Sequence, residues 1–346
     1  MKTDRLSNFE LLRIISMCGI IAIHYLAGHL GGMAENATFP NFEWFLSQFI
    51  SSVACPLVNC FVLISGYFLV RKKVFGIRKV VDLLLITAFY GVIGYGIGAF
   101  MGVIPITVKG LLYAFFPFFE GKRWFVETYI ILILLCPFIN RIINGIDKKS
   151  FQILLTIQIF LFSLWYSVGL SSPILDDGYG IINFITLYLL GAYYRLYGSE
   201  TFLWKLNKKK LFAGYILCSI MTFVLSYFIY PFGYSFITNI VGAVFLFLFF
   251  AKVQIGCNKK VNVISEAAFD VYFVHSDAYT SRLLIYELLQ GKLFIGSVWI
   301  IPHLLISIII LYLFGMIMFK MRSFIFSKSI DKLVDNFSWL NSTRTI

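Results

Sequence analysis

LLRIISMCGIIAIHYLAGH, residues 11–29, is apolar enough to cross a lipid bilayer, yet it contains Arg13 and His24. An α-helix turns about 100° and rises about 1.5 Å per residue, so these two side chains fall on nearly the same face, about 16 Å apart along the axis. Ionisable side chains are costly in hydrocarbon and by default mark functional sites. The stretch therefore predicts a membrane helix with a polar stripe that leads from Arg13 to His24.

Each of these residues also has a simpler explanation. Arg13 could extend to the lipid headgroups, or it could pair with Glu10 one turn earlier on the same face. His24 could form a structural hydrogen bond with a neighbouring helix. The sequence leaves these alternatives open.

The rest of the chain has the composition of a membrane protein. Of its 346 residues, 60% are hydrophobic and 13% are charged, and the mean hydropathy is +0.86. The first apolar segment lacks the short apolar core and the small-residue cleavage site of a signal peptide, so we expect it to be retained. Lipid offers backbone polar groups no partner, and the apolar runs are too continuous for barrel strands. We therefore expect an all-α, polytopic helical bundle.

A window of about 20 residues per crossing predicts about ten transmembrane helices. They are expected near residues 9–30, 44–70, 80–104, 124–141, 151–170, 180–197, 211–230, 235–252, 264–285 and 294–319. With the N-terminus inside, 24 of the 29 Lys and Arg residues fall on one side, which predicts that both termini are cytoplasmic. Residues 1–325 would form one transmembrane domain and 326–346 a short cytoplasmic tail. Because the net charge of +12 follows this topology, it does not indicate nucleic-acid binding.

The predicted ninth span, FDVYFVHSDAYTSR, is unusually polar for a buried helix because it contains Asp270, His275 and Asp277. Asp270 and Asp277 are seven residues apart and would share one helix face. These groups could support His24, or they could form a polar lock between helices. Neither the histidines nor the six cysteines have the spacing of metal ligands, so we expect no metal site.

The predicted second span ends in FVLISGYFLVRKK, residues 61–73. Ser65 and Gly66 would allow another helix or a ligand to approach the backbone closely. A cytoplasmic basic cluster follows, which consists of Arg71, Lys72, Lys73, Arg78 and Lys79, and its candidate donor-binding residues are Arg71, Lys72, Lys73 and Arg78. Topology or lipid phosphates could account for the cluster, and a phosphate-bearing donor is the sharper alternative.

The predicted fourth span begins within GKRWFVETYIILILLCPFIN, residues 121–140. Trp124 and Tyr129 fit an aromatic belt at the outer membrane surface. Glu127 lies within a turn of that surface and could help bind a polar acceptor.

Taken together, these segments resemble the acyltransferase-3 family of membrane O-acyltransferases. The resemblance rests on Arg13-x10-His24, on SGY at 65–67 with basic residues after it, on WFVETYIILILLCPFIN at 124–140, and on FDVYFVH at 269–275. The opening NFELLRIISM is similar to bacterial members that acetylate cell-surface polysaccharides. The likeness covers about residues 5–325.

The resemblance implies that an acyl group, usually acetyl, passes from cytoplasmic acetyl-CoA to a glycan hydroxyl at the cell membrane. It implies that Arg13 and His24 are the essential pair, and it maps the donor site to Arg71 and Arg78. These two arginines are seven residues apart, whereas the family's common form is Arg-x-x-Arg. The expected partners are acyl-CoA, a glycan or lipid-linked oligosaccharide, and membrane lipids, with no permanently bound cofactor.

An imidazole, whose ordinary pKa is about 6.5, could act as a general base or could accept the acyl group itself. The sequence does not distinguish these two roles for His24. The residues expected to support the acceptor are Trp124, Glu127, Tyr129, Asp270 and His275.

A transporter or flippase for a lipid-linked glycan or small anion is the main alternative function. The chain lacks the sequence repeats and the matched, interrupted helices that are typical of such proteins. A non-catalytic scaffold or sensor would leave His24 without a role.

Overall fold

The computed structural model describes residues 6–26, 32, 37–72, 76–116, 123–169 and 176–335, with side chains described up to residue 327. Every regular element within these ranges is helical, which confirms the all-α prediction. The longer helices are α1 (Ser7–Leu26), α2 (Phe42–Leu69), α3 (Ile77–Phe100), α5 (Trp124–Gly145), α8 (Ile181–Tyr197), α10 (Lys208–Leu225), α11 (Ile237–Ala251) and α15 (Ile300–Asp335). The shorter ones are α4 (Val108–Phe115), α6 (Lys148–Ile159), α7 (Trp165–Ser167), α9 (Phe202–Lys205), α12 (Lys259–Glu266), α13 (Ala268–Ser276) and α14 (Ala278–Ser281).

Six helical segments among the described residues are long and apolar enough to cross a membrane. They are Ser7–Leu26, Phe42–Leu69, Ile77–Phe100, Trp124–Gly145, Lys148–Ser167 and Ile300–Ser327. The helix Ile237–Ala251 is apolar but shorter. These segments establish a membrane protein, while the count of ten spans and the cytoplasmic termini stay predictions. Helix α15 continues to Asp335, past the boundary at residue 325 that was expected for the tail.

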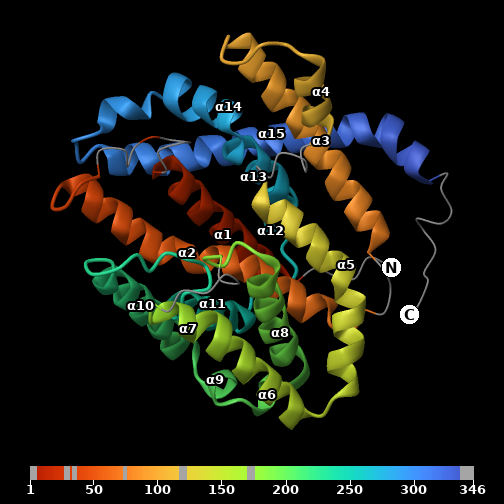
Figure 1. Ribbon diagram of the computed structural model, residues 1–346, viewed down its shortest axis with the longest axis vertical. Helices are drawn as coiled ribbons and strands as arrows, with labels where there is room; N and C mark the ends of the chain where they lie inside the picture. Colours follow the sequence, from red (N-terminus) through yellow and green to blue (C-terminus); the bar gives the residue numbers. More distant parts are fainter. Residues whose placement is uncertain are drawn as a thin grey trace.

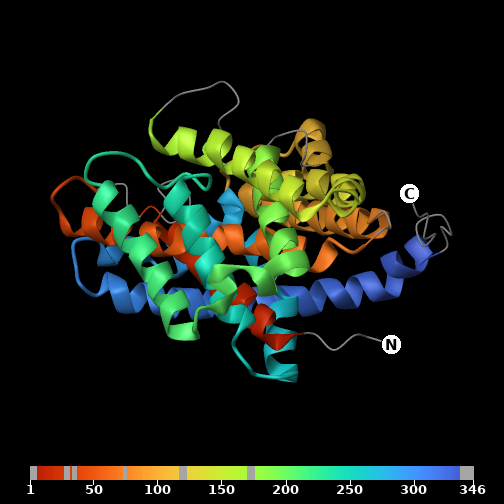
Figure 2. The ribbon, with the colours of Figure 1, turned by 90° about the horizontal axis from the view of Figure 1, so that it is seen from below.

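Helix α1 lies in the interior of the bundle. It packs against α2, α11, α12, α13 and α15, and α2 in turn packs against α8, α10 and α11. Figure 1 shows α10 and α11 on one side of α2, with α13 and α15 on the other. Figure 2 shows α15 along one face of the molecule and α6 along the opposite face. Five other helices therefore contact α1, and Arg13 and His24 of its polar stripe are partly buried among them.

Two glycines set the distance between α2 and α8. A Cβ atom at Gly66 would overlap the carbonyl of Tyr188, and one at Gly191 would overlap the carbonyl of Leu63. Small residues at such positions let the backbones of two helices touch. The close approach predicted at Gly66 is thus made by another helix.

The predicted span 264–285 is not one continuous helix. Asp277 has an extended conformation, with ψ 127°, and its side chain accepts a hydrogen bond from the backbone N–H of Thr280. An aspartate that caps a new helix in this way satisfies an otherwise unpaired N–H and ends the preceding helix. The chain therefore divides into α13 and α14 at this point, and Asp270 and Asp277 do not share one helix face as predicted.

Candidate active site

Arg13 is paired with Glu10, and a second helix holds Glu10 in place. Its Nη1 donates to Glu10 Oε1 at 2.5 Å, and the Ser265 hydroxyl donates to Glu10 Oε2 at 2.5 Å. The pairing with Glu10 that the sequence allowed is present, and it ties α1 to α12. The Arg13 side chain is still 31% exposed, so it remains accessible to a ligand.

Arg13 lines a cavity, which we call the Arg13 cavity. Its volume is about 470 Å³, which is within the usual range of small-molecule sites. The lining residues are Glu10, Arg13, Phe61, Ser65, Lys79, Phe125, Tyr129, Ser265, Glu266, Ala268, Phe269 and Phe319. Lys79 and Glu266 are exposed, so this cavity opens at the protein surface.

A chain of hydrogen bonds crosses the wall of the Arg13 cavity. Lys79 Nζ donates to the Tyr129 hydroxyl at 2.8 Å, and the Ser65 hydroxyl donates to the Phe61 carbonyl at 3.0 Å. Tyr129 and Ser65 lie 2.9 Å apart. Because Ser65 donates its single hydroxyl proton to the Phe61 carbonyl, the Tyr129 hydroxyl is the donor in its hydrogen bond with Ser65. Tyr129, which was expected in an outer aromatic belt, is instead a buried part of the cavity wall.

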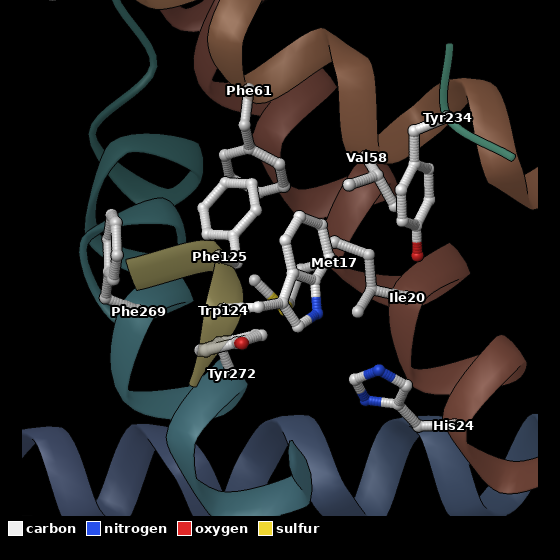
Figure 3. A pocket seen from close by; sticks show the side chains of 10 residues that line it. All are labelled: Met17, Ile20, His24, Val58, Phe61, Trp124, Phe125, Tyr234, Phe269 and Tyr272. Carbon is white, nitrogen blue, oxygen red and sulfur yellow. The ribbon is translucent and has the colours of Figure 1, made fainter. Parts of the chain in front are cut away.

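His24 lines the second cavity, which we call the His24 cavity. Its volume is about 20 Å³, which is room for about one water molecule. The lining residues are Met17, Ile20, His24, Val58, Phe61, Trp124, Phe125, Tyr234, Phe269 and Tyr272. Figure 3 shows the His24 ring directed from α1 toward this group of aromatic and aliphatic side chains. Besides the phenols of Tyr234 and Tyr272, the imidazole of His24 is the ionisable group among the residues that line this cavity.

The two cavities adjoin. Phe61 from α2, Phe125 from α5 and Phe269 from α13 line both of them, and we call these three residues the phenylalanine constriction. The rings of Phe61 and Phe125 are 6.3 Å apart and edge to face. The three rings are therefore a shared wall between the Arg13 cavity, which opens at the surface, and the His24 cavity.

His275 lies beside His24, with ring centroids 5.0 Å apart. It is fully buried, and its Nδ1 is 2.5 Å from the Val271 carbonyl oxygen. A carbonyl oxygen only accepts, so Nδ1 carries the proton and Nε2 of the neutral ring is an acceptor. Within the described residues, His275 Nε2 has no hydrogen-bond partner. Of the residues predicted to support the site, His275 therefore lies beside His24 and has an available lone pair.

Asp270 is directed away from both cavities. Its carboxylate binds Arg322 through Nε at 2.6 Å and Nη2 at 3.1 Å, and it accepts a hydrogen bond from Tyr90 at 2.8 Å. Asp270 is only 1% exposed. Asp270 therefore does not support His24 directly. It forms the polar lock between helices that was the alternative prediction for this span, and it joins α13 to α15 and α3.

Of the four predicted donor-binding residues, the three that the structure describes, Arg71, Lys72 and Arg78, do not line the Arg13 cavity. Arg71 and Lys72 are exposed, and Arg78 binds Asp82 at 3.1 Å. Lys73 lies outside the described residues. The basic residue of this cluster that does line the cavity is Lys79. The charge pattern pointed to the cluster, but only the orientation of α3 selects Lys79 from it.

The remaining predicted residues divide between the site and the scaffold. Trp124 lines the His24 cavity, where it stacks on Tyr234 at 5.3 Å and is partly exposed. Glu127 Oε1 accepts a hydrogen bond from the backbone N–H of Arg123 at 3.2 Å, and so caps the first turn of α5. Gly66 faces α8 rather than a cavity.

Among the described residues, no group of three or more His, Cys, Asp or Glu side chains could hold a metal ion. The chemistry that these residues do offer is that of an imidazole in a small, mainly apolar cavity, which shares a wall with a larger cavity that contains two cations. Such an imidazole can take a proton from a hydroxyl or attack an acyl carbon.

Comparison with known proteins gives one match. A family model described as an acyltransferase domain, Acyl_transf_3, matches residues 6–326, which includes both cavities. No curated protein and no solved structure matches the chain.

Proposed function

Because the chain belongs to the acyltransferase-3 family and is a membrane protein, we propose that it transfers an acetyl group from cytoplasmic acetyl-CoA to a hydroxyl of a cell-surface or lipid-linked glycan. The family supports an acyltransferase in the membrane. The donor, the acceptor, the role of His24 and the choice of the cell membrane are the proposed part.

The observation that carries the proposal is the pair of adjoining cavities. The Arg13 cavity opens at the surface and contains Arg13 and Lys79, which suit the carbonyls and phosphates of a CoA arm. The His24 cavity lies beyond it, at the end of the stripe that begins at Arg13. The CoA arm would lie in the first cavity, with its phosphates near Lys79, Arg71 and Lys72, and the thioester would meet the imidazole in the second.

Two balanced routes use the same atoms. In the first, His24 removes the proton of the glycan hydroxyl, the oxygen attacks the thioester carbon, and the C–S bond breaks as the thiolate leaves with the proton. In the second, the unprotonated nitrogen of His24 attacks the thioester carbon, the C–S bond breaks and the thiolate leaves. The glycan hydroxyl then attacks the acetyl carbon, the bond from that carbon to the imidazole nitrogen breaks, and the hydroxyl proton goes to the thiolate. Both leave CoA thiol and an acetyl ester.

His275 is proposed as a positioning residue for either route. Its Nε2 is an acceptor next to the His24 ring, so it can receive an N–H of His24 and stabilise the ring when it is protonated. Trp124, partly exposed in the wall of the His24 cavity, is proposed to contact the acceptor sugar, as aromatic rings do. Glu127 would support that wall through its cap on α5.

The test uses membrane vesicles that contain the full chain and labelled acetyl-CoA. We expect label to appear in the surface polysaccharide with the wild type and to be lost with His24→Gln. The matched control is His303→Gln, because His303 lines neither cavity and instead bonds to Tyr25 at 2.6 Å and to the Leu289 carbonyl at 2.9 Å. Transfer should persist in this control.

Two results would reject the proposal. One is transfer by folded His24→Gln at the wild-type rate. The other is His24-dependent movement of an unmodified glycan across the membrane in the absence of acetyl-CoA, because that is the behaviour of a flippase.

A further inference from the structure

We infer that the phenylalanine constriction, Phe61, Phe125 and Phe269, sets the length of the acyl group that reaches His24 and restricts it to two carbons. This inference rests on the proposed function and adds the determinant of acyl specificity, which neither the family match nor the position of His24 supplies.

The His24 cavity is much smaller than the Arg13 cavity. The Arg13 cavity, at about 470 Å³, has room for a long arm. The His24 cavity, at about 20 Å³, holds about one water-sized group. A methyl group is about that size, whereas a propyl chain is not. An acetyl thioester can therefore bring its carbonyl carbon to His24 with the methyl group accommodated, and a butyryl thioester cannot.

The rings of the phenylalanine constriction are held in place by the helices that carry them and by neighbouring aromatic side chains. Phe61, Phe125 and Phe269 come from three different helices, so no single helix movement removes all of them. Phe125 packs on the Phe184 ring at 5.3 Å, and both Phe125 and Phe269 pack on Tyr129, at 6.1 and 6.0 Å. Dense aromatic packing of this kind resists the displacement that a longer chain would require.

The wall of the His24 cavity suits an apolar methyl group. Met17, Ile20 and Val58 line this cavity together with the three rings of the phenylalanine constriction. Because these side chains already fill the space around the cavity, an additional methylene group has no room beside His24.

The experiment measures release of free CoA thiol from acetyl-, propionyl- and butyryl-CoA in membranes that carry the chain, with the rate in His24→Gln membranes subtracted. We expect the wild type to use butyryl-CoA at least about tenfold more slowly than acetyl-CoA, since one methylene is worth about 10- to 200-fold in a fitted pocket. Phe269→Ala should raise the butyryl-to-acetyl ratio about tenfold.

The matched control is Phe249→Ala on α11. Phe249 has the same partly buried character as Phe269 and packs on Phe212 at 5.3 Å, but it lines neither cavity. This variant should keep the wild-type ratio. If Phe269→Ala does not fold, the milder Phe269→Leu should still increase the relative use of propionyl-CoA.

The outcomes separate the two proposals. Equal use of butyryl- and acetyl-CoA by the wild type would overturn this inference while leaving the proposed function intact. The same ratio in folded Phe269→Leu or Phe269→Ala as in Phe249→Ala would overturn it as well. Absence of His24-dependent thiol release from every acyl-CoA would overturn the proposed function, and the inference with it.

Discussion

Replacing Asp270 by Leu should destabilise the protein strongly, because it removes one partner of a buried ion pair. Asp270 accepts two hydrogen bonds from Arg322 and one from Tyr90, and it is 1% exposed. Without the carboxylate, the Arg322 guanidinium stays buried and unpaired. Breaking such a pair by removing one partner costs about 3–5 kcal/mol, most of it from the uncompensated charge.

The size of the effect can be checked by a double-mutant cycle. In Asp270→Leu/Arg322→Met both charges are gone, and apolar side chains fill the space, so the double variant should recover about 2 kcal/mol or more of the loss. The assay is unfolding of the purified protein in mixed micelles with increasing SDS, followed by circular dichroism. The control is Asp82→Leu, which breaks the pair with Arg78, whose side chain is 30% exposed. An exposed pair of this kind contributes about 1 kcal/mol at most.

Either of two results would refute this role of the ion pair. One is that Asp270→Leu unfolds within about 0.5 kcal/mol of the wild type, which is the range of surface substitutions. The other is that the double variant is as unstable as the sum of the two single variants. In either case the pair would not hold α13 against α15 in the way that its geometry indicates.

Three further substitutions test other parts of the site. Lys79→Met should raise KM for acetyl-CoA about tenfold with little change in kcat, whereas Lys208→Met, at an exposed lysine of α10 that lines neither cavity, should not; equal effects on KM would remove Lys79 from the donor site. His275→Phe should lower kcat and leave KM unchanged, and a rise in KM alone would argue against its role beside His24. Gly66→Val should lower the free energy of unfolding in SDS titrations by about 1–3 kcal/mol, because the added carbons meet the backbone of α8; a neutral result would contradict this contact.

Some of the site could be predicted from sequence because it depends on local regularity. Arg13 and His24 lie on one helix, so the helical repeat alone predicts that they share a stripe. In the structure each of these two side chains lines one of the two cavities. The apolar composition likewise indicates helices, because lipid leaves few other ways to satisfy the backbone.

Other features depend on contacts between distant parts of the chain. Arg322 lies 52 residues from its partner Asp270, and no local pattern pairs them. The division of the ninth predicted span follows from the cap formed by Asp277, whereas a hydropathy window averages over that residue. Lys79 was one of several clustered cations, and only the packing of α3 directs it to Tyr129.

The bond between Asp270 and Arg322 also bears on how the protein responds to ionic strength. Dissolved salt screens charges that it can surround, and it screens buried pairs much less. The exposed pair between Lys148 and Glu200, 2.6 Å apart, should weaken as salt increases. The buried pair between Asp270 and Arg322, which anchors α13, should not weaken. His275 on α13 therefore keeps its place beside His24 in dilute and in concentrated electrolyte alike.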